Sequence, residues 1–317
     1  MAPLGFVSRS QKLGLAGKSV PMTILRDPVI QGVVRITSDA PGPHVVMFCG
    51  IHGDEVSGIH AIEKMLFDLF GGTRELLRGS LTMARANEQA IAAERRYVKH
   101  NMNRMFRQNY GSEIDKECYE FRRTQELKSV LETCDYFLDF HSAPIADVPF
   151  LVAEEKAVEF YSKLGISRIM TGWSKFSSGT IGGDTENYAN ARGALSATLE
   201  SGSHFDKASN DVAYAAAISL LSVLGMIERD EKPAATQADV FEMHSVVTKE
   251  FDDFRYAGEP RNFQFVKKGE PFAYQNGQPM KVGEDSYLLI PMKPSEIRLH
   301  EEVCYLGRKI QSPLSEA

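Results

Sequence analysis

The chain contains few cysteines and no long apolar run. Its 317 residues include four cysteines, and no two of them form a Cys-x-x-Cys pair. Scattered cysteines of this kind are typical of reduced, buried thiols, so we expect a cytoplasmic protein with neither disulfides nor a thiolate metal site. No apolar run reaches the ~18 residues that a membrane-spanning helix needs, and the first residues show no secretory signal. We therefore expect no membrane partner.

Charge of one sign is not concentrated anywhere along the chain. Lysine and arginine number 36 against 42 aspartate and glutamate, which gives a net charge of −6, and the two signs are interleaved. Because no basic stripe marks a nucleic-acid surface, we expect no nucleic-acid partner. With 43% hydrophobic and 25% charged residues, the composition is that of a globular protein with one large or two smaller domains.

Strand and helix patterns alternate through roughly the first 230 residues. Extended apolar runs predict strands at 45–49, 80–86, 136–140, 150–152 and 195–199, and a further extended stretch from about 20 to 37. Apolar residues at helical spacing predict helices near 56–70, 114–131 and 212–227. This alternation indicates an α/β protein with a layered sheet that is parallel at least in its centre.

The pattern changes near Glu228. Segment 228–236 is charged and carries a proline, which is typical of a linker. Beyond it, apolar residues alternate along short runs that turn residues such as Asn276-Gly277 separate. The sequence thus predicts an α/β domain over 1–230 and a smaller all-β domain over 237–312.

Three residues with metal-binding side chains follow predicted strands. His52 and Glu55 come directly after the run 45–49, and His141 comes directly after a similar run. Nitrogen and oxygen ligands suit zinc, and a set of two His and one Glu leaves a fourth position open for water, as in catalytic zinc sites. Ligands of parallel sheets bind at the carboxyl ends of the strands, where Glu200 is also expected to lie.

A basic segment between two predicted strands carries Arg96, Asn103 and Arg104. The guanidinium group of arginine binds a carboxylate with two parallel hydrogen bonds, so a loop of this composition near a strand end can hold an acidic substrate. The alternative is a solvated basic loop, which the composition alone does not exclude.

Four short motifs together match one family in their order and spacing. They are His52-Gly-Asp-Glu55, Asn103-Arg104-Met-Phe106, Asp139-Phe-His141 and Thr198-Leu-Glu200. The chain resembles the succinylglutamate desuccinylase/aspartoacylase family, relatives of the zinc carboxypeptidases, from about residue 45 to 228 and more weakly beyond. The resemblance implies an α/β fold with a zinc-carboxypeptidase-like mixed sheet flanked by helices. It also implies that the 1–230 domain is catalytic and that the all-β domain covers the active site.

The resemblance implies the catalytic parts of a zinc enzyme. His52, Glu55 and His141 would ligate one zinc ion per chain. Glu200 would be the general base, and Arg96 would polarise the substrate carbonyl.

The resemblance also implies substrate-binding residues. Asn103 and Arg104 would hold a substrate carboxylate, and Tyr305 is the candidate for a tyrosine of the β domain that reaches the cleft. Arg192 is a candidate for a further carboxylate anchor. Where the family often has Asp two residues before the Asn-Arg pair, this chain has Asn101. An asparagine oxygen can still accept a hydrogen bond from a ligand histidine, but without the charge.

The implied reaction is zinc-dependent hydrolysis of the amide bond of a small anionic N-acyl amino acid, similar to N-succinylglutamate or N-acetylaspartate. One alternative is a metallocarboxypeptidase acting on short peptides or cell-wall fragments, against which a β domain that closes the cleft argues. Another is a catalytically silent binding protein, which the complete set of ligands and Glu200 disfavours. The sequence leaves open the acyl group, the amino acid, assembly into a homo-oligomer and the use of another divalent metal.

Overall fold

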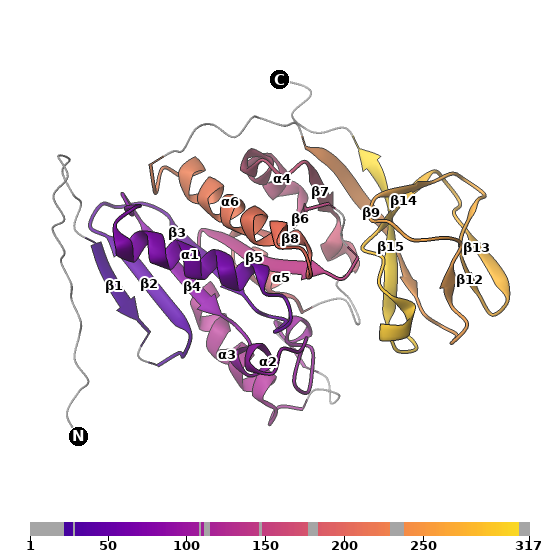
Figure 1. Ribbon diagram of the computed structural model, residues 1–317, viewed down its shortest axis with the longest axis horizontal. Helices are drawn as coiled ribbons and strands as arrows, with labels where there is room; N and C mark the ends of the chain where they lie inside the picture. Colours follow the sequence, from indigo (N-terminus) through magenta and orange to yellow (C-terminus); the bar gives the residue numbers. More distant parts are fainter. Residues whose placement is uncertain are drawn as a thin grey trace.

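The fold is built on one large mixed sheet with helices on both faces (Figure 1). The computed structural model describes residues 22–27, 29–107, 109–110, 115–145, 148–176, 183–228 and 238–310. The sheet has 12 strands, in the spatial order β1 (Met22–Arg26), β2 (Val33–Ser38), β4 (Ser80–Arg85), β3 (His44–Cys49), β5 (Tyr136–Ala143), β8 (Leu195–Ser203), β6 (Phe150–Ala153), β7 (Arg168–Thr171), β9 (Asp239–Thr248), β15 (Glu302–Ile310), β14 (Ser286–Leu289) and β11 (Gln264–Val266).

The centre of the sheet is parallel, as the alternating pattern predicted. Strands β4, β3, β5 and β8 are parallel neighbours, whereas β6 runs antiparallel to β8. From Val45 to Cys49, strand β3 is buried throughout, because helices cover both of its faces. The mixed α/β fold with flanking helices is therefore confirmed.

The helices form two layers, one on each face of the sheet. The first layer holds α1 (Ser57–Gly71), α4 (Glu155–Tyr161) and α6 (Ala208–Val223), and the second holds α3 (Tyr119–Leu131) and α5 (Thr185–Asn190). Helix α1 ends, as predicted, where Gly72 takes the left-handed conformation with φ +75° that glycine adopts without steric cost. No helix in the described part of the chain is long and apolar enough to cross a membrane.

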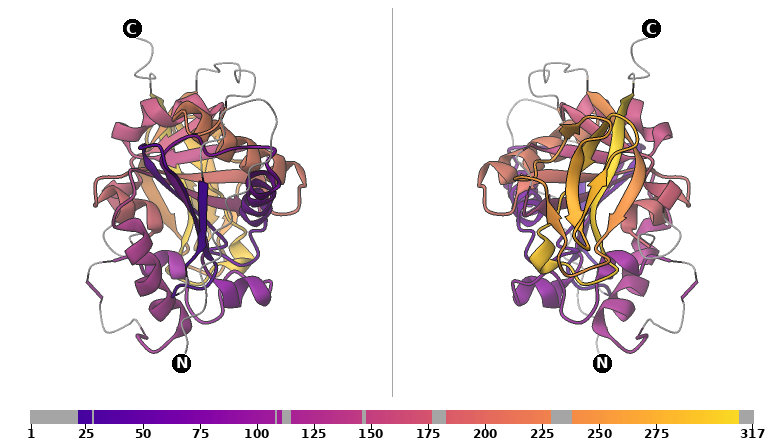
Figure 2. Two further views of the ribbon diagram at one scale, coloured as in Figure 1. Left: turned by 90° about the vertical axis from the view of Figure 1, so that its left-hand side faces the viewer. Right: turned by 90° about the vertical axis from the view of Figure 1, so that its right-hand side faces the viewer.

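The C-terminal region is all strands apart from one short 3₁₀ turn, η4 (Pro294–Glu296), among the described residues 238–310. Strand β9 pairs in parallel with β7, so the large sheet continues from the α/β region into this part (Figure 1). The right-hand view of Figure 2 shows the orange and yellow strands of this part facing the viewer. A separate small sheet is formed by β10 (Arg255–Tyr256), β12 (Pro271–Gln275) and β13 (Gln278–Lys281). The all-β character of this region is confirmed, while residues 229–236 of the predicted linker lie outside the described residues.

The sequence prediction was wrong for the stretch from about 20 to 37, which is not one strand. Strands β1 and β2 are antiparallel and are joined by a turn. In this turn Asp27 Oδ1 accepts hydrogen bonds from the amides of Val29 and Ile30 at 2.9 and 2.8 Å, and Gly32 takes φ +73°. The turn was not predicted because β-branched residues, which favour strands, flank it on both sides.

Several short elements were not predicted. They are α2 (Glu88–Ala92) and the 3₁₀ turns η1 (Met102–Arg104), η2 (Ser162–Leu164) and η3 (Trp173–Phe176), together with α4, α5 and β7. Elements of three to seven residues span too little of a helical or strand period for an apolar pattern to stand out.

Candidate metal centre and active site

The candidate site lies at the carboxyl ends of the central strands. His52 and Glu55 follow β3, and His141 lies near the end of the neighbouring strand β5. Glu200, on β8, is directly opposite His141 in the register of the parallel pair. The sheet therefore brings together residues from three segments that are far apart in the sequence, as the positions of the predicted strand ends indicated.

The three predicted metal ligands are in mutual contact. Glu55 Oε1 lies 2.7 Å from His52 Nδ1, and Glu55 Oε2 lies 2.9 Å from His141 Nδ1. The side chains are only 2 to 4% exposed, and the ligand atoms all lie within 4.8 Å of one another. This buried group of two imidazoles and one carboxylate can hold a metal ion.

The hydrogen bonds of His52 support a metal-ligand role. Its Nε2 lies 3.1 Å from Asn101 Oδ1, which also accepts a hydrogen bond from the amide of Asn103 at 3.0 Å. Burial and the nearby charge of Arg96 lower the pKa of His52 to about 4, so the ring carries one proton near neutral pH. When this proton is on Nε2, it is donated in a hydrogen bond to Asn101 Oδ1, and the Nδ1 lone pair faces the Glu55 carboxylate. A lone pair and an anion repel unless a cation lies between them, so these donors fit a metal ion.

His141 has a matching arrangement. Its Nδ1 faces Glu55, while its Nε2 lies 3.1 Å from Asp139 Oδ2. Burial alone would lower the pKa of His141, but the charges of Asp139 and Glu55 raise it well above 6.5. Burial would raise the pKa of Glu55, but the two histidines hold it well below 4.5, so this carboxylate is ionised. The partner on the outer nitrogen of each imidazole fixes the orientation of the ring.

Glu200 has the environment of a proton acceptor. Burial raises the pKa of its carboxyl to about 7, and the charge of His141 partly offsets this effect. Its Oε2 is buried and has no hydrogen-bond partner among the described residues. A general base works best when its pKa lies near the working pH, so this carboxylate is suited to accept a proton beside the three ligands.

Arg96 reaches the ligand group from the segment after α2. Its Nη1 donates to Glu55 Oε1 at 2.9 Å, while 38% of its side chain remains exposed. The buried carboxylate of Glu120, on α3, shapes this segment by accepting hydrogen bonds from the amides of Val98 and Lys99 at 2.9 and 2.8 Å. Glu120 was not predicted from the sequence, because it lies on a helix more than 20 positions away from the amides that donate to it.

Asn103 and Arg104 lie in the turn η1, beside the N-terminus of α5. The Oδ1 of Asn103 accepts a hydrogen bond from the amide of Thr185 at 3.2 Å. Arg104 Nη1 donates to the carbonyl of Asn103 at 3.0 Å, and its side chain is partly exposed. This turn is therefore held against α5 by a side chain of the predicted substrate-binding pair.

Tyr305 lies on β15 and is buried against Trp173. It is 3% exposed, and its ring centroid lies 4.9 Å from that of Trp173. Burial raises the pKa of the Tyr305 phenol, and the positive charges of Arg104 and Arg96 partly offset this effect. The C-terminal strand thus brings a tyrosine close enough to interact electrostatically with both arginines.

Arg192 is not brought to the site. Its Nε contacts Glu132 Oε1 at 2.6 Å, and its guanidinium lies 3.4 Å from the centroid of the Tyr188 ring. It precedes the amino end of β8, whereas Glu200 lies toward the carboxyl end. An extended strand rises about 3.3 Å per residue. Arg192 and Glu200 are near in sequence but are therefore separated by most of the length of β8.

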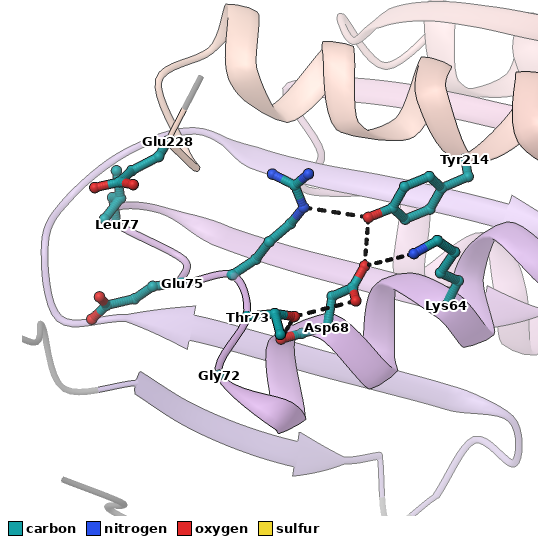
Figure 3. A pocket seen from close by; sticks show the side chains of 9 residues that line it. Lys64, Asp68, Gly72, Thr73, Glu75, Leu77, Tyr214 and Glu228 are labelled. Atoms are coloured by element: carbon teal, nitrogen blue, oxygen red, sulfur yellow. Dashed lines mark hydrogen bonds and ion pairs between the residues drawn. The ribbon is translucent and has the colours of Figure 1, made fainter. Parts of the chain in front are cut away.

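A separate hollow lies between α1 and α6, at the end of α1 away from Glu55 (Figure 3). Its polar side chains bind one another: Lys64 Nζ and Thr73 Oγ1 lie 3.4 and 3.2 Å from oxygens of Asp68, which the Tyr214 hydroxyl also contacts. The Nε of Arg74 donates to the same hydroxyl at 3.3 Å. This network joins the two helices and is separate from the candidate active site.

Comparisons with known proteins match the chain to one family. The family model described as the Succinylglutamate desuccinylase/Aspartoacylase catalytic domain matches residues 41–224, which is more than half of the chain. A succinylglutamate desuccinylase of Erwinia tasmaniensis is 26% identical over 286 residues, covering 82% of this chain and 83% of its own. One from Serratia proteamaculans is 27% identical over 271 residues, covering 78% and 79%.

Solved structures share the fold. The succinylglutamate desuccinylase of Vibrio cholerae has a TM-score of 0.73 at 19% identity, over 91% of this chain and 88% of its own. A product-bound structure of the ectoine utilization protein EutE from Ruegeria pomeroyi has a TM-score of 0.65 at 19% identity, over 93% and 97%. The similarity extends over the C-terminal region as well as the α/β region.

Proposed function

From the fact that this chain belongs to the succinylglutamate desuccinylase/aspartoacylase family of hydrolases, we propose that it is a zinc-dependent deacylase of a small anionic N-acyl amino acid. One observation carries the proposal: His52, Glu55 and His141 converge on one another, and Glu200 lies beside them on the next strand. This is the combination that metal-assisted hydrolysis of an amide requires.

His52, Glu55 and His141 are the residues that would hold the zinc ion, one per chain. Two nitrogens and a carboxylate are ligands that zinc prefers. When bound, the ion supplies a Lewis acid for the substrate carbonyl and lowers the pKa of water at its open position to about 7. Asn101 and Asp139 orient the two imidazoles from their outer nitrogens.

Glu200 acts as the general base and then as the general acid of the reaction. Its carboxylate takes a proton from the attacking water and then delivers that proton to the leaving nitrogen. Water is thereby added across the carbon–nitrogen bond, and the products are a carboxylic acid and a free amine. Arg96 donates hydrogen bonds to the oxygen on which negative charge develops, an effect worth about 3–4 kcal/mol per well-placed donor.

The substrate side of the site is positively charged. The positive charges of Arg104 and Arg96 both lower the pKa of the Tyr305 phenol, and all three side chains carry groups that can bind a carboxylate. We assign Arg104, with Asn103 and Tyr305, to the substrate carboxylate. We further propose that the C-terminal β region covers the site and limits the substrate to small molecules. The names of the relatives favour an N-succinylglutamate-like compound, and N-acetylaspartate is the related choice.

Arg104→Ala tests both the reaction and the nature of the substrate. We expect KM for an anionic N-acyl amino acid to rise about 10- to 100-fold, because a charge-assisted hydrogen bond is lost. KM for a neutral analogue should change little. Hydrolysis would be measured across N-acetyl, N-succinyl and N-formyl amino acids, with dipeptides included as carboxypeptidase substrates. Arg95→Ala removes an exposed arginine of the same basic segment and is the matched control.

Two outcomes would contradict this assignment. Equal effects of Arg104→Ala on anionic and neutral substrates would remove its role as a carboxylate anchor. Faster release of C-terminal residues from dipeptides than hydrolysis of any N-acyl amino acid would favour a metallocarboxypeptidase instead.

The pH dependence of kcat/KM should report the ionisation of Glu200. A base must be deprotonated to act, so activity should rise with pH through the pKa of this group. Burial raises that pKa to about 7, and the positive charge of a bound cation lowers it again. The rising limb should therefore have an apparent pKa between 4.5, the ordinary value, and about 7. A decrease in kcat/KM between pH 5 and 7 would contradict the assignment.

A further inference from the structure

We infer that Thr185 is a positioning residue that orients both histidines of the metal centre. The inference rests on the metal site of the proposed function. Thr185 is the first residue of α5 and is fully buried. Its amide and its hydroxyl bind Asn103 and Asp139, which are not metal ligands, so it acts through these neighbours.

The hydroxyl of Thr185 holds the residue behind His141. Its Oγ1 donates to Asp139 Oδ2 at 2.5 Å, and the same oxygen lies 3.1 Å from His141 Nε2. Asp139 is fully buried, and its other oxygen has no hydrogen-bond partner among the described residues. A buried carboxylate with so few donors depends strongly on each of them. Loss of the hydroxyl would therefore free Asp139 to turn and would leave the His141 ring less fixed.

The backbone of Thr185 leads to the other histidine. Its amide donates to Asn103 Oδ1 at 3.2 Å, and the Asn103 amide in turn donates to Asn101 Oδ1 at 3.0 Å. That Asn101 oxygen lies 3.1 Å from His52 Nε2. Two series of polar contacts therefore meet at Thr185. One ends at His52 Nε2 through a hydrogen bond with Asn101, and the other ends at His141 Nε2 through an ion pair with Asp139.

The segment around Thr185 is itself held tightly. Gly183 takes φ +100°, and a side chain there would lie 2.6 Å from the carbonyl of Arg104. The Gly183 carbonyl accepts a hydrogen bond from the amide of Phe106 at 2.7 Å. Asp184 Oδ2 accepts one from Trp173 Nε1 at 3.1 Å. Because the two residues before it are fixed, Thr185 is tied to the turn that carries Arg104.

Thr185→Val is the most direct test. Valine has the same shape and keeps the backbone amide that binds Asn103, but it removes the hydroxyl that binds Asp139. We expect the dissociation constant for zinc, measured by competition with a chromophoric chelator, to rise about 10- to 100-fold. Thr185→Ser restores a hydroxyl and should bind zinc within about threefold of the wild-type protein.

Thr124→Val is the matched control. Thr124 is equally buried, and its hydroxyl donates to the Glu120 carbonyl at 2.8 Å on α3, away from the two series of contacts. This variant should bind zinc as the wild type does. Thermal unfolding establishes that each variant is folded. If the Thr185→Val protein does not fold, Thr185→Ala is used in its place.

The outcomes separate the two proposals. A folded Thr185→Val protein with wild-type zinc affinity overturns the positioning role alone, as does an equal loss of affinity in Thr124→Val. A wild-type protein that binds no zinc overturns the proposed function and this inference together.

Discussion

Removal of the metal is expected to lower the hydrolysis rate by about 10⁴-fold, and one equivalent of zinc should restore it. The magnitude follows from the several kcal/mol that a Lewis acid contributes to the stabilisation of charge in the transition state. His52→Ala should have the same effect without a chelator, because it leaves two protein ligands in place of three. Zinc content by atomic emission and the rate of hydrolysis would be measured on the same samples.

A histidine outside the centre provides the control for this experiment. His60 is exposed on α1, and His60→Ala should retain both zinc and activity. Full activity after complete removal of metal would contradict the proposed reaction. Retention of one zinc ion per chain by His52→Ala would show that the ion is bound elsewhere.

Glu200→Gln is expected to lower kcat by about 10³-fold while zinc content stays unchanged. Glutamine has nearly the same shape, but an amide cannot take up a proton from water and return it, and general acid–base catalysis contributes roughly 10²- to 10⁴-fold. Because Glu200 is not among the three ligands that contact one another, its substitution leaves the metal-binding group intact. Steady-state kinetics and metal analysis on one preparation measure both effects.

The control for this variant is a second buried carboxyl. Glu186 lies on α5, and burial raises its pKa well above 4.5, as burial also raises that of Glu200. It is not in the group of metal ligands, and Glu186→Gln should retain kcat. A Glu200→Gln protein with wild-type kcat would refute the assignment of the base. Equal losses in both variants would indicate a general effect of removing a buried acid.

The sequence predicted the convergence of the site because the site follows from topology. His52, Glu55, His141 and Glu200 come after or near the end of apolar runs, and parallel strands place their carboxyl ends at one edge of a sheet. Two inferences were sufficient to predict the site. The apolar runs were identified as strands, and ligands of parallel sheets bind at the carboxyl ends of the strands. The alternation of strands and helices also predicted an α/β layered sheet with a parallel centre, whereas the mixed sheet flanked by helices was implied by the family resemblance.

Roles that depend on long-range side-chain contacts could not be predicted in this way. Arg192 is only eight residues from Glu200 in sequence, but it pairs with Glu132 at the other end of the strand. Glu120 and Thr185 act through hydrogen bonds to residues 21 to 82 positions away. Each role arises from the packing of helices on the sheet, which a local pattern does not contain.

Asn101 is the clearest local departure from the family pattern, and its structural setting explains how it is tolerated. The oxygen of its amide, fixed by the backbone of Asn103, faces His52 at 3.1 Å, as a carboxylate oxygen would. The ring orientation is thus kept, while the additional negative charge is not.

Diffraction from zinc-loaded crystals, recorded on both sides of the zinc absorption edge, tests the central claim most directly. We predict one strong anomalous peak per chain, about 2.0–2.2 Å from the Nδ1 atoms of His52 and His141 and from a carboxylate oxygen of Glu55. Absence of a peak at these three residues, or a single peak on other side chains, would contradict the account.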